Sequence, residues 1–125
     1  MIKQIKSSEI KNFLIDNKNV ELLDVRTQDE WNNVGRPDGE NLGLKTHFIT
    51  IVRSPDPAAN KEFIEEVKKM IDPNKELLVM CKAGSRSMVA SQLLSQEKIN
   101  CINISDGFEG NGNDPGWKNE GLPSK

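Results

Sequence analysis

Short apolar runs alternate with helix-like segments along the chain, and turn-forming residues separate them. Residues 20–25 (VELLDV) are a short run rich in valine and leucine, and residues 77–80 (LLVM) are continuously apolar. Both have the composition of buried strands, which is typical of parallel sheets. Residues 2–5, 47–52 and 101–104 have the composition of further strands. Strands that alternate with helices in this way predict an α/β domain with a mainly parallel sheet covered on both faces.

The helices between these strands are predicted from apolar residues that recur every three or four positions. Capping residues and prolines indicate where each helix begins, because their side chains or fixed φ angles suit the first turn. Residues 33–45 are rich in Gly, Pro, Asn and Asp and predict an irregular loop instead. The predicted helices are residues 7–16, a short helix that starts at the Thr27–Glu30 capping box and contains Trp31, a helix that starts at Asp56-Pro57 and continues to about residue 71, residues 87–96, and a short helix from Asp114-Pro115 through Trp117.

Composition and charge narrow the class of protein. The chain has 125 residues, which fits one domain, and its 17 basic and 19 acidic residues give a net charge of −2. This balance offers no electrostatic basis for binding nucleic acid or an anionic membrane. The longest apolar run, residues 77–81, is far shorter than the roughly 20 residues of a membrane span, and the N-terminus lacks the apolar stretch of a secretory signal. Two cysteines make no disulfide framework, so we expect reduced thiols. Taken together, length, composition and cysteine content predict one cytoplasmic domain, residues 1–125.

The candidate chemistry lies in residues 81–86 (CKAGSR), directly between a predicted buried strand and a predicted helix. In parallel α/β sheets, ligands bind beyond the carboxyl ends of the strands, where helix N-termini present unpaired N–H groups. Cys81 at this position is a candidate nucleophile, because the backbone donors and Arg86 would favour its thiolate form. Gly84 lets the loop curl into an anion-binding nest, and Lys82 adds positive charge at its mouth. The alternative interpretation is that Cys81 is the buried last residue of the strand.

This cysteine loop and two further motifs resemble those of single-domain rhodanese-like sulfurtransferases. The three motifs follow in the order and at the spacing of that family along most of the chain. The resemblance implies a three-layer α/β/α fold with a five-stranded, mainly parallel sheet and the cysteine loop at its carboxyl edge. The matching segments are residues 20–31 (VELLDVRTQDEW), the cysteine loop followed by residues 87–94 (SMVASQLL), and a closing motif in residues 106–110 (DGFEG), 116–118 (GWK) and 121–123 (GLP).

The resemblance also implies a mechanism without a metal or an organic cofactor. The Cys81 thiolate would take a sulfane sulfur from a donor such as thiosulfate and become a persulfide. The persulfide would then pass its outer sulfur to a nucleophile such as cyanide or a thiol. The residues implied by the resemblance are Cys81 and Arg86 as catalytic groups, Lys82, Ala83, Gly84 and Ser85 as the loop that binds the substrate sulfur, Asp24 as a residue that supports the loop through hydrogen bonds, and Arg26 as a residue that forms a salt bridge or reaches the pocket.

Two alternative functions stay open at the level of the sequence. Related phosphatases of the cell-cycle-control type and arsenate reductases have five residues between the cysteine and the arginine of their loop, whereas this chain has four. The smaller nest suits a sulfur atom better than a tetrahedral phosphate. The domain could instead be a sulfur-relay or binding module that receives sulfur from a protein donor and has negligible activity with thiosulfate. Residues 34–42 and 111–116 depart from the family pattern, which leaves the donor, the acceptor and the pathway open.

Two other residues with reactive side chains have weaker support. Cys101 lies in a predicted strand, where we expect a core residue more than a resolving thiol for the Cys81 persulfide. His47 begins another strand, and a thiolate prepared by the loop needs no general base. No cluster of Cys and His has the spacing of metal ligands.

Overall fold

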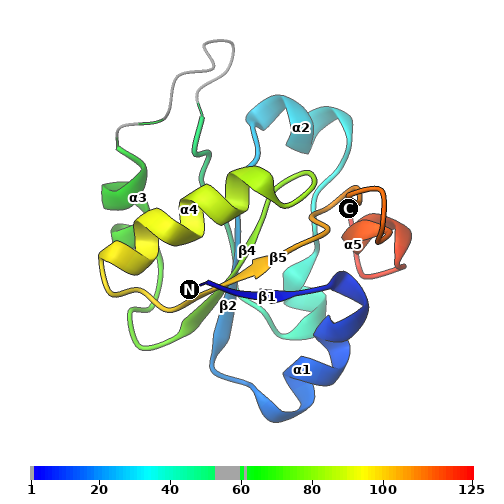
Figure 1. The fold of residues 1–125 in the computed structure, drawn as a ribbon, viewed down its shortest axis with the longest axis horizontal. Coiled ribbons are helices and arrows are strands. Elements are labelled where there is room, and N and C mark those ends of the chain that lie inside the picture. The colour runs from blue at the N-terminus through cyan, green and yellow to red at the C-terminus, as the bar shows by residue number, and fades with distance from the viewer. Residues whose placement is uncertain (1, 53–59, 61) are drawn as a thin grey trace.

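Five strands form one parallel sheet, as the alternating pattern predicts. The computed structural model describes residues 2–52, 60 and 62–125. The strands are β1 (Lys3–Ile5), β2 (Val20–Asp24), β3 (Thr46–Phe48), β4 (Glu76–Met80) and β5 (Cys101–Ile104). They lie in the order β1-β5-β4-β2-β3, and every neighbouring pair is parallel (Figure 1). The predicted α/β fold with a five-stranded, mainly parallel sheet is confirmed.

Helices lie on both sides of this sheet. The helices are α1 (Ile10–Asp16), α2 (Gln28–Asn33), α3 (Phe63–Met70), α4 (Ser85–Gln96) and α5 (Gly116–Asn119), with short 3-10 turns η1 (Ser7–Glu9) and η2 (Gly39–Leu42). Val67 of α3 and Leu94 of α4 belong to a buried cluster on one face. Ile10 of α1 and Trp117 of α5 belong to a second cluster on the other face (Figure 1). The turn η2 lies inside the predicted irregular loop, and the predicted helix start at Asp56-Pro57 lies outside the described residues.

The two central strands supply both clusters, which explains why both are rich in apolar residues. Leu23 and Val79 face α3 and α4, whereas Leu22 and Leu78 face α1 and α5. Successive side chains of a strand point to opposite faces, so a strand covered on both faces carries apolar side chains on both of them. All residues of β2 are buried, including the charged ones.

The edge strand β3 is shorter than the predicted strand 47–52. Beyond it, the N–H of Ile49 donates to the carbonyl of Asp24 and that of Ile51 donates to the carbonyl of Val25. A regular parallel ladder would advance two residues on both strands between these bonds. Here the donors advance two residues, from Ile49 to Ile51, but the acceptors at the end of β2 advance only one, from Asp24 to Val25. The segment therefore stays hydrogen-bonded to β2 while the regular pairing ends.

The carboxyl ends of β2 and β4 lie side by side at one edge of the sheet. Asp24 and Met80 are register partners, and the N–H of Val25 donates to the carbonyl of Met80 at 2.8 Å. The segments that follow these strands, which begin with Val25 and with Cys81, therefore meet at this edge. This is the edge at which parallel α/β sheets bind their ligands.

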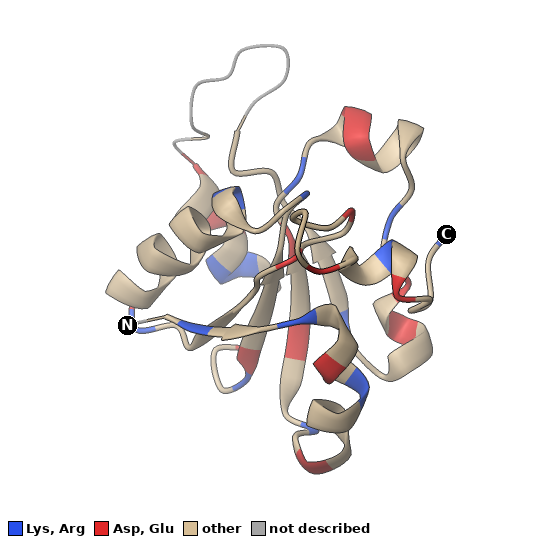
Figure 2. Cartoon of the chain, turned by 45° about the vertical axis from the view of Figure 1, so that its right-hand side comes forward, with Lys and Arg blue, Asp and Glu red and all other residues tan. Residues whose placement is uncertain are grey.

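The elements are short and of mixed charge. Within the described ranges, no helix has both the length and the apolar character that crossing a bilayer requires. Lys and Arg are spread over many elements and interspersed with Asp and Glu (Figure 2).

Candidate active site

Cys81 lies directly after β4, at the carboxyl edge of the sheet. Its side chain is 1% exposed. The backbone N–H of Gly84 donates to its Sγ at 3.1 Å, and the hydroxyl of Ser87 lies 3.2 Å from the same sulfur. Both groups belong to the N-terminus of α4, where the helix dipole is positive. The sulfur therefore sits in a position that can hold negative charge, as the sequence analysis expected of this loop.

Gly84 gives the loop its shape. It caps the N-terminus of α4 with a φ of +105°, a left-handed conformation that residues with a side chain rarely adopt. A Cβ at this position would lie 2.2 Å from the backbone oxygen of Ser105, which follows β5. The close approach of these two backbones leaves room only for glycine. Because Gly84 already caps the helix, α4 begins at Ser85, two residues before the predicted start at Ser87.

The closing segment, residues 106–110, packs against the outer side of the cysteine loop. The N–H of Phe108 donates to the carbonyl of Cys81 at 2.8 Å, and the N–H of Glu109 donates to the carbonyl of Lys82 at 3.0 Å. A Cβ at Gly107 would lie 2.4 Å from the Lys82 carbonyl oxygen. These bonds tie the carbonyls of Cys81 and Lys82 to the closing segment, while the Gly84 N–H donates to the sulfur.

A carboxylate of α2 holds the guanidinium of Arg86. Nη1 and Nη2 of Arg86 donate to the two carboxylate oxygens of Glu30 at 2.7 and 2.8 Å. Glu30 also accepts hydrogen bonds from the backbone N–H and the hydroxyl of Thr27, both at 3.1 Å. Burial alone would raise the pKa of Glu30, but the hydrogen bonds from Arg86 and Thr27 and the Arg86 charge outweigh burial and lower this pKa to about 2. Hydrogen bonding to Glu30 raises the pKa of Arg86, against the opposing effect of burial.

Pairing with Glu30 reduces the positive charge that Arg86 can offer to the Cys81 sulfur. The guanidinium lies beside the cysteine loop, but Glu30 balances its charge and uses two of its N–H groups. The positive contributions that face the sulfur without such a partner are the N-terminus of α4 and its Gly84 N–H. A direct role of Arg86 in holding the substrate sulfur stays a prediction.

Asp24 and Arg26 form an ion pair under the loop. Both side chains are fully buried, and Arg26 Nη2 donates to Asp24 Oδ2 at 2.8 Å and to the carbonyl of Gly35 at 2.9 Å. The Arg26 guanidinium also lies 4.3 Å from the centre of the Phe108 ring. Phe108 in turn binds the Cys81 carbonyl. In the described part of the chain, contacts through Arg26 and Phe108 link Asp24 to the loop, and a role of Asp24 in supporting the loop stays a prediction.

The remaining loop residues differ in exposure. Lys82 and Ser85 are exposed, and Ala83 is half-buried. The exposed Lys82 side chain is open to solvent, and its role in attracting an anionic donor stays a prediction. Among the described residues, no group of three or more His, Cys, Asp or Glu side chains is arranged to hold a metal ion.

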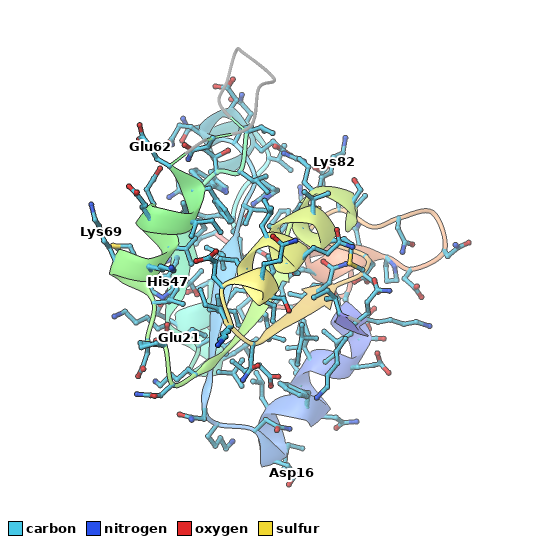
Figure 3. All side chains as sticks on the ribbon, turned by 60° about the vertical axis from the view of Figure 1, so that its left-hand side comes forward. Asp16, Glu21, His47, Glu62, Lys69 and Lys82 are labelled. Atoms are coloured by element: carbon cyan, nitrogen blue, oxygen red, sulfur yellow. The ribbon has the colours of Figure 1, made fainter. Side chains whose placement is uncertain are left out.

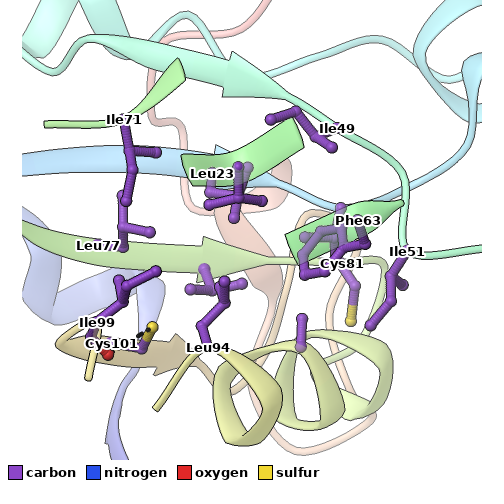
Figure 4. Close-up of a cluster of buried hydrophobic side chains, with 14 residues drawn as sticks. Leu23, Ile49, Ile51, Phe63, Ile71, Leu77, Cys81, Leu94, Ile99 and Cys101 are labelled. Atoms are coloured by element: carbon purple, nitrogen blue, oxygen red, sulfur yellow. Dashed lines mark hydrogen bonds between the residues drawn. The ribbon is translucent and has the colours of Figure 1, made fainter. Parts of the chain in front are cut away.

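Cys101 is a core residue at the start of β5. It lies opposite Leu77 of β4, and Cys81 follows Leu77 by four residues along the same strand direction. At ~3.3 Å per strand residue, ~13 Å separates the two positions along the sheet. Figure 4 shows the two cysteines at opposite ends of the buried cluster. Burial, with a smaller effect from nearby Glu76, raises the pKa of Cys101 to about 12, so this thiol is protonated and too distant to resolve a Cys81 persulfide.

His47 lies away from the cysteine loop and is paired with Glu21. Its Nε2 lies 2.9 Å from Glu21 Oε1, and both side chains are buried. Glu21 also accepts a hydrogen bond from the N–H of Asp72 at 3.1 Å. Figure 3 shows His47 and Glu21 well separated from Lys82 of the loop. His47 therefore lies out of reach of the sulfur.

Three residues that the sequence analysis did not assign to the site complete it. Glu30 is visible in the sequence only as part of a capping box, and Ser87 only as the start of a helix. Asn103 is a buried polar residue in an apolar strand, and its Oδ1 contacts the Ser87 hydroxyl. A polar residue in such a strand is the one available signal, because burial there requires a hydrogen-bond partner.

Comparison with known proteins agrees with this geometry. The family model of the rhodanese-like domain matches residues 7–113. The uncharacterized protein RP600 of Rickettsia prowazekii is 38% identical over 124 residues, which cover 98% of this chain and 97% of that protein. Thiosulfate sulfurtransferase 18 of Arabidopsis thaliana is 30% identical over 88 residues, which cover 69% of this chain and 62% of that protein. The crystal structure of Rv0390 from M. tuberculosis has a TM-score of 0.86 at 30% identity and covers 98% of this chain and 96% of its own. The extent of the family match and the shared fold establish that the chain belongs to the family of rhodanese-like domains.

Proposed function

We propose that the protein is a sulfurtransferase that carries a sulfane sulfur on Cys81 and delivers it to a nucleophilic acceptor. The observation that carries this proposal is the hydrogen bond from the Gly84 N–H, at the N-terminus of α4, to Cys81 Sγ. A backbone donor and a helix dipole directed at one sulfur stabilise negative charge on it. The name of the Arabidopsis relative, a thiosulfate sulfurtransferase, supports the same chemistry.

The first half-reaction loads the cysteine. The Cys81 thiolate attacks the outer sulfur of thiosulfate, a new S–S bond forms at Cys81, and the S–S bond of thiosulfate breaks. Its electron pair leaves with sulfite. The product is a Cys81 persulfide whose outer sulfur carries the negative charge.

The second half-reaction unloads it. A nucleophile attacks the outer sulfur, and the electron pair of the breaking S–S bond returns to Cys81 Sγ. Cyanide gives thiocyanate, and an acceptor thiolate gives a persulfide of its own. Two half-reactions through a covalent intermediate predict ping-pong kinetics.

The surroundings of Cys81 favour a donor with a narrow, negatively charged end. The sulfur is almost fully buried, so the donor must project its sulfane sulfur toward it. Exposed Lys82 at the loop attracts an anion. Thiosulfate meets both conditions, and so does a persulfide on a protein donor.

The experiment that tests the proposal is the intact mass of the reduced protein after incubation with excess thiosulfate. We expect a gain of one sulfur atom that cyanide removes. Cys81→Ser should show no gain, because it lacks the nucleophile. Cys101→Ser is the matched control and should gain sulfur like the wild type, because Cys101 is buried in the core away from the loop.

Two further outcomes separate the alternatives. If folded, reduced protein gains no sulfur from thiosulfate but gains it from a persulfidated protein, the function is a sulfur relay with a protein donor. If the protein releases phosphate from an aryl phosphate and Cys81→Ser does not, the loop belongs to a phosphatase and the sulfurtransferase proposal is wrong.

A further inference from the structure

A series of buried polar contacts leads from Cys81 through Ser87 to Asn103. Asn103 lies in β5 and is 1% exposed. The Ser87 oxygen lies 3.2 Å from Cys81 Sγ and 2.5 Å from Asn103 Oδ1. A buried amide in an apolar strand costs free energy unless its polar atoms are hydrogen-bonded. Asn103 meets this condition through Ser87 and Gly84 beside the cysteine loop and through Gln4 of β1.

The backbone of Gly84 fixes the orientation of the Asn103 amide. Asn103 Nδ2 lies 3.2 Å from the carbonyl oxygen of Gly84, which can only accept a hydrogen bond. The second Nδ2 proton goes to Gln4 Oε1 at 3.1 Å. A rotated amide would bring two acceptor oxygens together at Gly84. Asn103 Oδ1 must therefore face Ser87 as an acceptor.

The Ser87 hydroxyl has one proton and three acceptors within reach, which are Cys81 Sγ, the Gly84 carbonyl and Asn103 Oδ1. Asn103 Oδ1 is the nearest of the three. If the hydroxyl donated to Cys81, two oxygens with no proton between them would face each other at 2.5 Å. The Ser87 hydroxyl therefore donates to Asn103 Oδ1, and the Ser87 oxygen presents a lone pair to the sulfur.

We propose that Asn103 is a positioning residue that acts on Cys81 through Ser87. Because the Ser87 hydroxyl donates to Asn103, it does not donate to the sulfur. This favours the neutral thiol of Cys81 over its thiolate, and the thiol S–H donates to the Ser87 oxygen. When Cys81 loses its proton to solvent, the Ser87 hydroxyl must turn away from Asn103 to donate to the thiolate. Gly84 thus favours the charged sulfur and Asn103 opposes it. The consequence for catalysis rests on the proposed function, whereas the effect on the thiol does not.

The test is the pH dependence of the ultraviolet absorbance of the thiolate in the full-length, reduced protein. The pKa of Cys101 is about 12, so the signal below that range reports Cys81. Asn103→Ala removes one acceptor of the Ser87 hydroxyl and leaves the Cys81 sulfur and the Gly84 carbonyl. The thiolate is the stronger acceptor of these two because it is charged, so the hydroxyl donates to the sulfur. We expect the profile to move to lower pH and the thiolate fraction on its acid side to rise about fivefold, the factor that about 1 kcal/mol gives. Asn103→Val suits a strand and serves the same purpose if Asn103→Ala does not fold.

A double-mutant cycle with Ser87 separates positioning from a general structural effect. In a Ser87→Ala background, Asn103→Ala should cause no further shift, because the group through which Asn103 acts is absent. Gln4→Ala is the matched control. It removes the acceptor on the side away from the sulfur and leaves the Gly84 carbonyl to orient the amide, so its profile should match that of the wild type.

An unchanged profile in Asn103→Ala would overturn the proposal. An equal shift with and without the Ser87 hydroxyl would overturn it as well, because Asn103 would then act by another route. Persulfide formation is measured separately on the same variants. A wild type that forms no persulfide while Asn103→Ala shifts the profile as expected would refute the proposed function and support this inference.

Discussion

The carboxylate of Glu30 and the guanidinium of Arg86 are joined by two hydrogen bonds of 2.7 and 2.8 Å. Glu30 also closes the capping box with Thr27, so one carboxylate fixes both the start of α2 and the charged side chain in the first turn of α4. The pair is locally neutral. A substitution of one partner therefore changes the charge beside Cys81, whereas a substitution of both does not.

Removing the guanidinium should slow the loading of Cys81. In Arg86→Ala, the Glu30 charge is left without its partner and repels both thiosulfate and a charged sulfur. We expect the rate of persulfide formation at low salt to fall about fivefold, and the loss to shrink as salt screens the charge. The measurement is the time course of the intact mass after addition of thiosulfate.

The double variant Arg86→Ala/Glu30→Gln tests this electrostatic explanation. It restores local neutrality and should recover most of the wild-type rate. If the double variant is as slow as Arg86→Ala, the guanidinium itself acts on the reacting sulfur, as the sequence analysis predicted for Arg86.

The same pair predicts how stability depends on pH. The pKa of Glu30 falls from its ordinary value of 4.5 to about 2 in the folded protein. The unfolded chain therefore binds this proton at a higher pH than the folded protein does. The contribution of ionised Glu30 to stability is complete above about pH 4.5 and is lost as the pH falls toward about 2.

Glu30→Gln isolates this contribution because it cannot titrate. At neutral pH the wild type should be more stable than Glu30→Gln by about 1 kcal/mol, a modest value because the pair is partly open to solvent. Urea unfolding at neutral pH and at about pH 3 should show this difference shrinking in acid. A difference that stays constant between the two conditions would mean that Glu30 does not carry the lowered pKa.

The sequence was sufficient for the elements that depend on local patterns. Runs rich in apolar residues identified β2 and β4, because a strand buried on both faces carries apolar side chains on both of them. The glycine in the cysteine loop indicated the turn because few other residues adopt a positive φ. The position of Cys81 followed from these two features together.

The sequence was insufficient where a residue serves two partners or pairs over a long range. Glu30 satisfies a local rule as a helix cap, and that rule hides its bond to a residue 56 positions away. Ser87 looks like an ordinary first-turn serine, and its contact with the sulfur depends on the path of the loop before it. Asn103 comes into place only when β5 pairs beside β4.

The close approach at Gly84 predicts a large penalty for a side chain. Gly84→Ala must adopt a left-handed φ and also place a Cβ 2.2 Å from the Ser105 backbone oxygen. Left-handed geometry alone costs ~1–2 kcal/mol. We expect the free energy of unfolding to fall by about 3 kcal/mol or more, because the backbone at Ser105 must move as well.

Gly112→Ala is the matched control for this penalty. Gly112 has a φ of +92°, but no atom lies within 4 Å of the position of its Cβ. Its substitution should cost only the ~1–2 kcal/mol of the backbone conformation. Equal losses for Gly84→Ala and Gly112→Ala in urea unfolding would mean that the contact with Ser105 is not limiting.

The buried pair of His47 and Glu21 predicts a loss of stability without a loss of chemistry. His47→Ala removes the side chain that lies 2.9 Å from the buried Glu21 carboxylate and leaves that carboxylate with the Asp72 N–H and with Lys75, whose Nζ lies 4.0 Å away. The loss of one partner from a buried pair costs ~3–5 kcal/mol when the remaining charge is uncompensated, and the lower end applies here because Asp72 and Lys75 still face Glu21. We expect a fall of this order in the free energy of unfolding, while the folded variant gains one sulfur per molecule from thiosulfate at the wild-type rate, because the pair is remote from Cys81.

Replacing both partners tests whether the fall in the free energy of unfolding comes from the Glu21 carboxylate that has lost its imidazole partner. Glu21→Leu/His47→Leu removes the carboxylate together with its imidazole partner, and apolar residues of similar volume often replace a buried pair at little cost. The double variant should therefore be more stable than His47→Ala. A double variant that is no more stable would assign the loss to packing of the imidazole ring, and a folded His47→Ala that gains no sulfur would place His47 in the chemistry of Cys81.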